Sequence, residues 1–584
     1  MSSVSDFLTA RSTYSLRSRW SLDIPVTDLC SYLFTSPTAE LSRTPIYLAA
    51  EKPETHNLSL HSHRRLVKKI ARGLRDAGLL PGQRVLAFSA NNVFYPSLYL
   101  AILAAGGVFT GANPIYTTRE LAFQLKDSGA SFCIASAASI KTAVDAADII
   151  GLDRRKVYVF DDGLLLGDVD GGTGVDRWTS DAGEPGKLYG VRHWSELVSD
   201  SDDFHWKPLQ TMGDVQQTAA INYSSGTTGV PKGVEITHRN LIANTIQVLH
   251  LGHLSPTLRE LPSRQIGMLP MYHAYGQTYY VMICPALNVP LYMIQKFDFL
   301  EFLGYIEKYK VTSIAGVPPI MIALAKHPGV SKFDLSSVRA LGSGAAPLGK
   351  DVMKEVEGKF LKRYGADIRV RQGWGMTETT CSILGHHPDD KEDDQGSVGE
   401  LLANCEAKIV DANDETIDLP AGVPGELYVR APNVCKGYYR NPKATAEIFT
   451  KDGWMRTGDI AYYNSIGKFY IELIKVKGNQ VAPAELEGVL LDHQKIADVA
   501  VIGIPYANDE RPRAYVVPIA NSGLTQEDVK DWVKERCTRY KWITGGVVFL
   551  DEIPKNPSGK ILRKVLRERA AHEVVDTGDS RAKL

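Results

Sequence analysis

Short apolar runs alternate with longer amphipathic stretches over most of the chain. Residues 85–88, 132–135 and 157–160 are continuous apolar runs of strand length, whereas residues 64–77 and 120–128 repeat apolar positions at helical spacing. Strands that alternate with helices are typical of layered folds built on parallel sheets. The pattern therefore predicts an α/β fold, with a large N-terminal domain of layered sheets and helices.

The pattern changes after about Tyr470, where a shorter unit begins. It contains a predicted strand at residues 499–502, a predicted helix at 527–537 and a basic helical tail at 560–569. A unit of about 110 residues is long enough for a separate domain. We therefore predict a large domain over residues 1–471 and a small, mobile α+β domain over residues 472–584.

Two other stretches of the large domain stand out. Residues 94–109 form the most apolar run, but they contain Pro96 and two glycines and are shorter than the ~20 residues of a membrane helix, so we predict a buried helix. Residues 161–190 are dense in Gly and Asp and lack periodicity, which predicts a surface insertion.

Composition and charge narrow the range of functions. The 584 residues are 44% hydrophobic and 23% charged, which fits globular domains and excludes a disordered or fibrous chain. Because 66 Lys and Arg residues nearly balance 67 Asp and Glu residues, no overall field favours nucleic acid or an anionic membrane. Seven scattered cysteines without a C-x-x-C pair argue against a disulfide scaffold or structural zinc and favour a reducing intracellular compartment.

A glycine-rich stretch at residues 223–234, Y-S-S-G-T-T-G-V-P-K-G-V, follows a short apolar run, and we name it the phosphate segment. Its backbone N–H groups and hydroxyls suit phosphate oxygens, and Lys232 supplies positive charge. A Walker loop, G-x-x-x-x-G-K-[ST], cannot be threaded through it. The stretch predicts a triphosphate site, with a flexible Ser/Thr/Gly turn as the alternative.

The phosphate segment resembles the signature loop of the adenylate-forming enzymes, which include acyl- and aryl-CoA ligases, peptide-synthetase adenylation domains and beetle luciferases. The other motifs of that superfamily follow in its order: L-P-M-Y-H-A-Y-G at 269–276, S-G-A-A-P-L at 343–348, Q-G-W-G-M-T-E at 372–378, G-E-L-Y-V-R at 425–430, W-M-R-T-G-D at 454–459, K-G-N-Q-V-A-P-A-E-L-E at 477–487 and P-K-N-P-S-G-K at 554–560. The resemblance runs from about residue 45 to 570 and is strongest to 4-coumarate-CoA ligase-type enzymes.

The resemblance implies a ligase that uses ATP, Mg²⁺ and coenzyme A. A carboxylate attacks the α-phosphate of ATP to give acyl-AMP and pyrophosphate, and the CoA thiol then displaces AMP. Attack of one anion on another demands positive charge and oriented donors, so electrostatic stabilisation should dominate. By the same resemblance the catalytic residues are Lys560, His273, Thr377 and Glu378, and Glu378 also binds the metal.

The remaining residues implied by the resemblance form two groups. The group that binds ATP and CoA is Ser224, Ser225, Gly226, Thr227, Thr228, Gly229, Lys232, Ala345, Gln372, Gly373, Trp374, Asp459, Lys475, Lys296, Lys477 and Gly478. The acyl pocket is Tyr272, Tyr275, Gly344 and Met376. Asp459 would accept hydrogen bonds from the ribose hydroxyls. Lys296, Lys477 and Gly478 would contact CoA.

Each assignment has a purely structural alternative. In these alternatives Lys560 is a solvated lysine of a basic tail, Asp459 is a turn residue and Glu378 is a helix cap. Trp374 stacks on adenine or walls the acyl pocket, or it belongs to the core. His273 closes the acyl pocket, or it is a satisfied core histidine.

One stretch departs from the 4-coumarate-CoA ligase pattern. A V-D-R-x-K segment normally precedes the E-L-I-K run, but here Ile471 passes directly into Glu472. The hinge aspartate and a ribose-binding arginine have no counterpart, and a shortened hinge would restrict rotation of the small domain. Either the gene model or transcript has lost a short piece of an active ligase, which we favour because the other motifs are intact, or the product is an impaired relative.

Function and location complete the expectations. A luciferase-like oxygenase or a non-catalytic nucleotide-binding protein is the alternative to an acid-CoA ligase, and too few residues follow Lys560 for a peptide-synthetase carrier domain. The motifs leave the acid open between aromatic and aliphatic.

The N-terminus lacks a secretory run, and we expect neither nucleic acid nor an integral membrane segment. The C-terminal Ala582, Lys583 and Leu584 resemble the S-K-L address, which implies an import receptor and a peroxisomal location.

Overall fold

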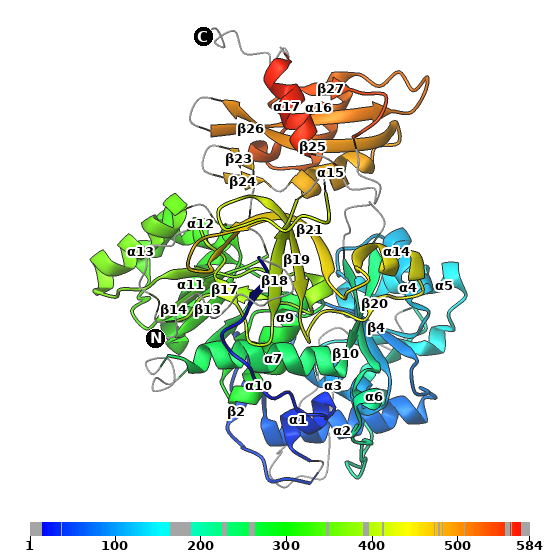
Figure 1. The fold of residues 1–584 in the computed structure, drawn as a ribbon. Helices are drawn as coiled ribbons and strands as arrows, with labels where there is room; N and C mark the ends of the chain where they lie inside the picture. The colour runs from blue at the N-terminus through cyan, green and yellow to red at the C-terminus, as the bar shows by residue number, and fades with distance from the viewer. Residues whose placement is uncertain are drawn as a thin grey trace.

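The chain folds into a large N-terminal domain and a small C-terminal domain stacked on it, as a computed structural model shows (Figure 1). The structure describes residues 14–36, 38–163, 189–224, 231–255, 263–345, 348, 350–388, 390, 396–411, 414–471, 474–476, 479–481, 483–506, 509–554, 561 and 563–573. This architecture confirms the predicted fold class. The exact domain boundary and the mobility of the small domain stay predictions.

The first layer of the large domain is an eight-stranded, mostly parallel sheet. Its order is β20 (Gly437–Tyr438), β10 (Lys232–Thr237), β9 (Thr218–Ser224), β5 (Val108–Gly111), β4 (Arg84–Phe88), β6 (Ala130–Ser136), β7 (Val157–Phe160) and β8 (Arg192–His193). Val85 and Ala87 of β4 pack with α2 (Leu60–Asp76) and α3 (Tyr95–Ala104), whereas Leu86 and Phe88 pack with α4 (Thr118–Ser128) and α5 (Ile140–Ile150). Successive side chains of a strand point to opposite faces, so an unbroken apolar run is what a sheet covered on both faces requires.

The second layer is a seven-stranded sheet. Its order is β15 (Val370–Gln372), β14 (Ala340–Ser343), β13 (Ser313–Gly316), β11 (Gln265–Gly267), β12 (Leu291–Met293), β2 (Pro45–Ala49) and β3 (Asn57–Ser59). Apolar side chains of α11 (Phe299–Tyr309), α12 (Pro318–Lys326) and α13 (Lys350–Tyr364) form a core with it. Helix α7 (His238–His253) contributes Leu241 to a core that both sheets share, and it packs Leu251 against a third sheet.

That third sheet is antiparallel throughout, unlike the parallel sheets that the alternating pattern predicted. Its order is β1 (Leu16–Arg17), β18 (Glu406–Val410), β19 (Gly425–Arg430), β21 (Met455–Tyr463) and β22 (Phe469–Ile471). The link from β21 to β22 spans only residues 464–468, and a connection this short permits only antiparallel pairing. The short helices of the large domain are α1 (Leu29–Phe34), α6 (Met212–Val215), α9 (Ala274–Gly276), the π-helical η6 (Gln277–Ile283), α10 (Cys284–Leu287) and α14 (Pro442–Ile448).

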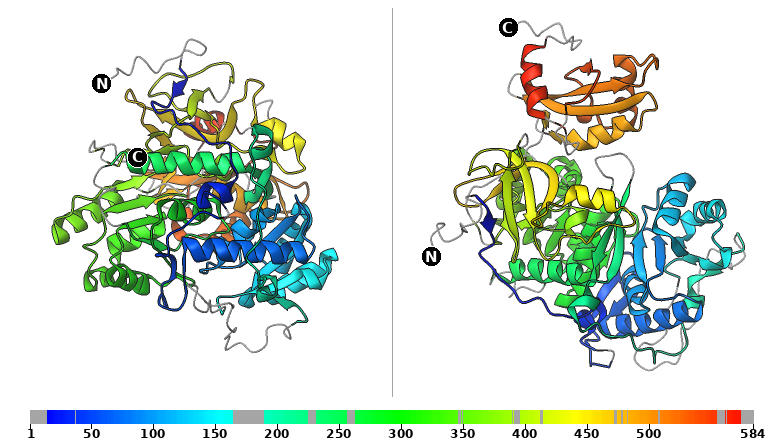
Figure 2. Two further views of the ribbon diagram at one scale, coloured as in Figure 1. Left: turned by 90° about the horizontal axis from the view of Figure 1, so that it is seen from below. Right: turned by 45° about the vertical axis from the view of Figure 1, so that its right-hand side comes forward.

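The small domain has cores of its own. Its elements are β23 (Ile474–Val476), β24 (Asn479–Val481), α15 (Pro483–Leu491), β25 (Ile496–Tyr506), β26 (Asp509–Pro518), α16 (Gln526–Arg536), β27 (Val547–Phe549) and α17 (Arg563–His572). Two clusters of buried apolar side chains, one around Val499 and Val516 and one around Ile502 and Leu566, lie entirely within this domain. The right view of Figure 2 shows it as a separate body next to the antiparallel sheet.

Most predicted elements are confirmed, with two corrections. The predicted buried helix at 94–109 is wrong at its end, because α3 stops at Ala104, the chain turns at Gly106 with φ 75°, and β5 begins at Val108. The predicted tail helix at 560–569 begins later, at Arg563. Of the predicted insertion at 161–190, residues 164–188 lie outside the described part of the chain. No described helix combines the length and the apolar character needed to cross a membrane.

Candidate active site

Several predicted residues lie where parallel strands end. Ser343 ends β14 and Gln372 ends β15, and the two residues are directly paired. The N–H of Gly373 donates to the carbonyl oxygen of Ser343 at 3.4 Å, and the side-chain oxygen of Gln372 accepts from the N–H of Leu348 at 2.6 Å. Ligands of open α/β sheets bind outside the carboxyl ends of the strands. Gly344, Ala345, Gln372 and Gly373 therefore share one such edge.

Glu378 is the most enclosed carboxylate of the predicted set. It lies in η8 (Thr377–Thr379), next to Thr377, and only 4% of its surface is exposed. The hydroxyl of Tyr438 on β20 donates to Glu378 Oε1 at 2.8 Å, and burial together with this carboxylate raises the pKa of Tyr438. Among the described residues no hydrogen bond is made to the second carboxylate oxygen, and carboxylate oxygens are ligands that hard cations prefer.

The phosphate segment is described only at its two flanks. Lys232 begins β10, and its ammonium lies 5.2 Å from the centre of the Tyr438 ring, the same tyrosine that contacts Glu378. Ser224 ends β9, and its buried hydroxyl, like that of Ser343, has no hydrogen-bond partner among the described residues. Such orphaned donors fit a site that a polar ligand completes. Ser225, Gly226, Thr227, Thr228 and Gly229 lie outside the described residues.

Asp459 and Trp374, 85 residues apart, meet directly. The indole Nε1–H of Trp374 donates to Asp459 Oδ2 at 2.9 Å. The Trp374 ring is half-buried and packs partly against the core of the antiparallel sheet. On β21, the strand that carries Asp459, the N–H of Gly458 donates to Glu426 Oε1 at 3.0 Å. The predicted ribose carboxylate is thus oriented by a residue that the sequence suggested for stacking or for the pocket wall.

Tyr275 is the side chain that links the aromatic segment to the edge of the second sheet. A Cβ added at Gly344 would meet its ring at 2.9 Å, so these two predicted pocket residues are in close contact. His273 Nδ1 accepts from the N–H of Tyr275 at 3.3 Å, which leaves Nε2 as the protonated nitrogen of the neutral ring. Desolvation lowers the pKa of His273, so the ring is neutral at pH 7. Tyr272 and Met376 are half-buried.

Of the predicted CoA contacts, Lys296, Lys477 and Gly478, only Lys296 lies within the described residues. Lys296 is exposed beyond β12, next to Gln295, whose amide donates to Asp162 at 2.7 Å. Lys475 lies on β23 of the small domain, and its side chain is not described. Lys477, Gly478 and Lys560 lie outside the described residues. Their roles stay predictions from the family resemblance.

Sequence reasoning missed a set of buried asparagines that hold the Glu378 segment. Asn244 on α7 donates to the carbonyl of Ser382 at 2.8 Å and accepts from its N–H at 3.1 Å. Asn433 donates to the carbonyls of Thr379 and Ser382 at 2.8 and 3.0 Å. These bonds fix the backbone on the C-terminal side of Glu378 without any contribution from the motif itself.

The sequence contained one signal for these hydrogen bonds from buried asparagines. Thr237 and Asn240 have the spacing of a capping box, and the structure confirms that they start α7 with reciprocal hydrogen bonds. Asn240 also donates to the carbonyls of Pro432 and Val434, on either side of Asn433. A capping box predicts where a helix begins, but it does not predict which distant loop the helix will hold.

Comparison with known proteins agrees with this geometry. Residues 39–439 match the family model "AMP-binding enzyme", and residues 485–560 match "AMP-binding enzyme C-terminal domain". The chain is 36% identical over 560 residues to the phenylacetyl-CoA ligase epaB of Aspergillus niger, covering 94% of this chain and 98% of that protein. It is 35% identical over 517 residues to 4-coumarate:CoA ligase 1 of Petunia hybrida, covering 86% and 87%. The ATP-bound crystal structure of MatB from Rhodopseudomonas palustris superimposes with a TM-score of 0.64 at 26% identity, covering 93% of this chain and 99% of that one.

Proposed function

The chain belongs to the AMP-binding enzyme family and is an AMP-forming acid-CoA ligase, and from this premise we propose its two half-reactions. In the first, the carboxylate of an aromatic or aliphatic acid attacks the α-phosphate of ATP, giving acyl-AMP and pyrophosphate. In the second, the thiol of CoA attacks the acyl carbon and AMP leaves. The observation that carries the proposal is the convergence of Lys232, Tyr438 and Glu378, with Ser224 paired to Lys232 and its hydroxyl without a partner among the described residues.

The first half-reaction needs positive charge where two anions meet. The phosphate segment supplies N–H and hydroxyl donors together with Lys232, and Thr377 bonds the α-phosphate. Lys560 of the small domain reaches the carboxylate and the α-phosphate. A cation placed there stabilises the negative charge on the oxygens around the pentacoordinate phosphorus of the transition state, so we assign Lys560 the largest share of the rate.

The metal proposed for this site is Mg²⁺, with Glu378 as its protein ligand. Within the described residues no three His, Cys, Asp or Glu side chains cluster to form an all-protein metal site. Mg²⁺ is usually held by one or two carboxylates together with substrate phosphates and water, so a single buried carboxylate fits it. When bound, the ion neutralises phosphate charge. Tyr438 keeps the Glu378 carboxylate in place through their 2.8 Å hydrogen bond.

The acyl pocket proposed here is walled by aromatic rings. Tyr275 packs against Gly344, and a neutral His273 adds an uncharged polar edge. The absence of a Cβ at residue 344 lets the Tyr275 ring approach the backbone, and aromatic walls of this kind suit a flat ring or a slender chain. The named activities of the phenylacetyl-CoA ligase and of 4-coumarate:CoA ligase support an aromatic acid. One methylene changes binding in such a pocket by only ~1–3 kcal/mol, so an acid panel must decide.

The experiment is a screen of carboxylic acids with two readouts. Acid-dependent ATP–pyrophosphate exchange reports the first half-reaction, and consumption of free CoA thiol reports the second. We expect both signals with phenylacetate- or coumarate-like acids. A chain that binds ATP but gives neither signal with any aromatic or aliphatic acid contradicts the proposed function and supports a non-catalytic nucleotide-binding protein.

The domain connection supports an alternative in which only the second half-reaction is impaired. In the structure β22 ends at Ile471 in the large domain and β23 begins at Ile474 in the small one, so little chain is available for a hinge. We propose that inserting a V-D-R-x-K segment between Ile471 and Glu472 raises the rate of thioester formation and leaves pyrophosphate exchange unchanged. An insertion of five Gly and Ser residues is the matched control for length alone. Equal thioester rates in all three proteins would show that the short connection does not limit rotation.

We further propose import into peroxisomes through the terminal Ala582, Lys583 and Leu584. The test is a fluorescent protein fused to the N-terminus, with and without these three residues. Punctate fluorescence that coincides with a peroxisomal marker is expected only when they are present. Diffuse fluorescence from both fusions would contradict this location.

A further inference from the structure

Two buried side-chain amides from distant parts of the sequence hydrogen-bond to each other. Asn222 Nδ2 donates to Gln277 Oε1 at 3.0 Å, and Gln277 Nε2 donates to Asn222 Oδ1 at 3.0 Å. The two residues are 3% and 1% exposed. Gln277 Nε2 also donates to the carbonyl of Tyr272 at 3.2 Å. The pair therefore satisfies itself and holds one further backbone group.

The pair joins the two halves of the candidate site. Asn222 lies on β9, two residues before Ser224, where the phosphate segment leaves the sheet. It is paired with Val234 on β10, and β9 is also paired with β5 at Ala220, so its position in the sheet is fixed. Gln277 begins η6 and ends what we name the acyl segment, residues 269–277. Neither side chain contacts substrate, because both are buried.

The acyl segment is anchored at its other end by a third buried amide. Asn91 Nδ2 donates to the carbonyl of Leu269 at 2.8 Å, and Asn91 Oδ1 accepts from the N–H of Met271 at 2.9 Å. Between the anchors the loop is tight, because a Cβ added at Gly276 would lie 2.2 Å from the carbonyl oxygen of Pro270. A loop held this closely moves as a unit, and Gln277 is its polar link to β9.

Stability alone does not require amides at these two positions. A buried hydrogen bond contributes about 1 kcal/mol net, and replacing both partners by apolar groups of similar shape is often nearly neutral. Two reciprocal hydrogen bonds fix the relative position of the two residues, because a shift of one amide misaligns both bonds. Apolar side chains in contact impose no such alignment and can shift relative to one another. The pair is therefore suited to transmit position.

We propose that Asn222 and Gln277 are positioning residues that couple occupation of the phosphate segment to the placement of the acyl segment. The inference rests on the proposed function, because it assigns the two segments to ATP and to the acid. ATP bound at the phosphate segment restrains the end of β9 and therefore Asn222. Through the amide pair this restrains Gln277, and through the hydrogen bond from Gln277 to the carbonyl of Tyr272 it restrains the pocket wall.

The test uses the full chain and three variants. Asn222→Leu combined with Gln277→Met removes both amides and keeps side-chain size, so no single amide is left buried without a partner. Asn222→Gln combined with Gln277→Asn exchanges the amides and keeps the reciprocal bonding. Ser97→Ala is the matched control, because it removes the buried 2.7 Å contact between Ser97 and His63 in the core of α2 and α3. Melting temperatures establish that each variant folds.

The first measurement does not depend on turnover. Hydrogen exchange of peptides covering residues 269–280 is followed with and without MgATP. We expect MgATP to slow exchange there in the wild type, in Ser97→Ala and in part in the exchanged pair, and to leave it unchanged in the Leu/Met variant. A wild-type segment that does not respond to MgATP, or a folded Leu/Met variant that responds like wild type, overturns the coupling.

The second measurement separates the two substrates. In the Leu/Met variant we expect the KM for the acid to rise about tenfold, a typical size for coupling between sites, while the KM for ATP changes less than about threefold. Unchanged KM values for both substrates overturn the inference, and so does an exchanged pair no better than the Leu/Met variant. If the wild type binds MgATP but activates no acid, the proposed function fails while the exchange measurement still decides the coupling.

Discussion

The two domains hold their candidate functional groups in different ways. In the large domain two of them are each held by a residue from elsewhere in the chain, Glu378 by Tyr438 and Asp459 by Trp374. In the small domain the helix that follows the predicted lysine is tied to its own domain, because Arg563 donates to buried Glu487 at 2.6 Å. The large domain therefore holds these two groups in place by itself, and under the proposed function the small domain would deliver the Lys560 cation as a unit. We therefore expect that a substitution in the small domain can impair the chemistry without impairing nucleotide binding.

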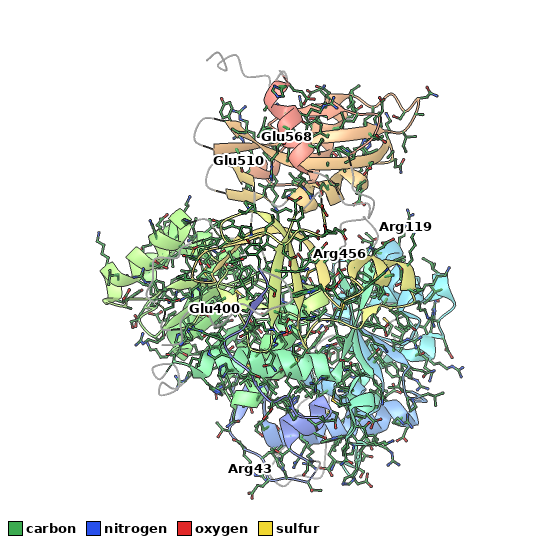
Figure 3. All side chains as sticks on the ribbon, in the orientation of Figure 1. Arg43, Arg119, Glu400, Arg456, Glu510 and Glu568 are labelled. Atoms are coloured by element: carbon green, nitrogen blue, oxygen red, sulfur yellow. The ribbon has the colours of Figure 1, made fainter. Side chains whose placement is uncertain are left out.

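The side of the large domain that faces the small one carries charged groups of the antiparallel sheet. Figure 3 shows Arg456 of β21 on that side and Glu510 and Glu568 within the small domain. Arg456 pairs with Glu415 at 2.8 Å, so its charge is already neutralised within the large domain. This internal pairing agrees with two bodies that are each complete by themselves.

The largest effect is expected from Lys560→Ala. Removing the cation should lower acid-dependent pyrophosphate exchange by about 10²- to 10³-fold, as removal of a single electrostatic stabiliser does in other enzymes. The Kd for ATP, measured by calorimetry, should stay unchanged because the large domain binds the nucleotide. Lys564→Ala, which removes another lysine of the same basic tail, is the control. Wild-type turnover by Lys560→Ala would assign Lys560 to that tail, and lost ATP binding would break the separation of the domains.

Glu378→Gln comes next. The amide oxygen can still accept from Tyr438, but the charge is lost, so the Mg²⁺ concentration for half-maximal activity should rise by about 100-fold. Tyr438→Phe keeps the Glu378 charge and removes the hydrogen bond that holds it, and we expect the Mg²⁺ concentration for half-maximal activity to rise about tenfold. A titration of pyrophosphate exchange with Mg²⁺ measures both. Equal metal dependence in wild type and Glu378→Gln would leave Glu378 as a purely structural buried group.

A smaller effect is expected at the ribose carboxylate. Asp459→Asn should raise the KM for ATP about tenfold, and Trp374→Phe, which keeps a ring but loses the indole N–H, about fivefold, corresponding to about 1 kcal/mol for one hydrogen bond. Trp374→Leu removes the ring as well. If Trp374→Phe has the wild-type KM for ATP and Trp374→Leu has a raised KM, Trp374 contributes by stacking or packing and not by orienting Asp459.

The smallest effect concerns stability and pH. Burial lowers the pKa of His63 to about 3, whereas the unfolded residue has its ordinary value of 6.5. The unfolded chain therefore binds more protons below pH 6.5, so this stability is present above pH 6.5 and is lost as the pH falls toward 3. At pH 5.5 the loss is about 1 kcal/mol.

The small domain should respond to acid in the opposite direction. Burial raises the pKa of Glu487, so its contribution is lost as the pH rises and not as it falls. Acid unfolding, followed by melting temperature between pH 7.5 and 5.5, should therefore begin in the large domain. His63→Gln keeps a partner for Ser97 but does not titrate, so it should weaken the dependence. An unchanged slope in that variant would show that other groups control acid stability.

Local patterns predicted much of the fold and the chemistry of the site, but not its contacts. The apolar runs that became β4, β6 and β7, and the amphipathic helices α2 and α4, were predictable because burial on one face or two dictates residue spacing. Gly106 was harder to interpret, because a single turn inside an apolar run separates a helix from a strand without changing hydrophobicity.

By itself the sequence determined the alternation of elements, the separate small domain and the order of the phosphate, ribose and lysine motifs. These depend on residue types and their spacing, which a linear pattern contains. Tertiary structure decided that Trp374 meets Asp459, that Tyr438 holds Glu378 and that Asn222 faces Gln277. Each of these bonds joins residues 55 to 85 positions apart, and only the packing of sheets and helices determines which distant donor reaches which acceptor.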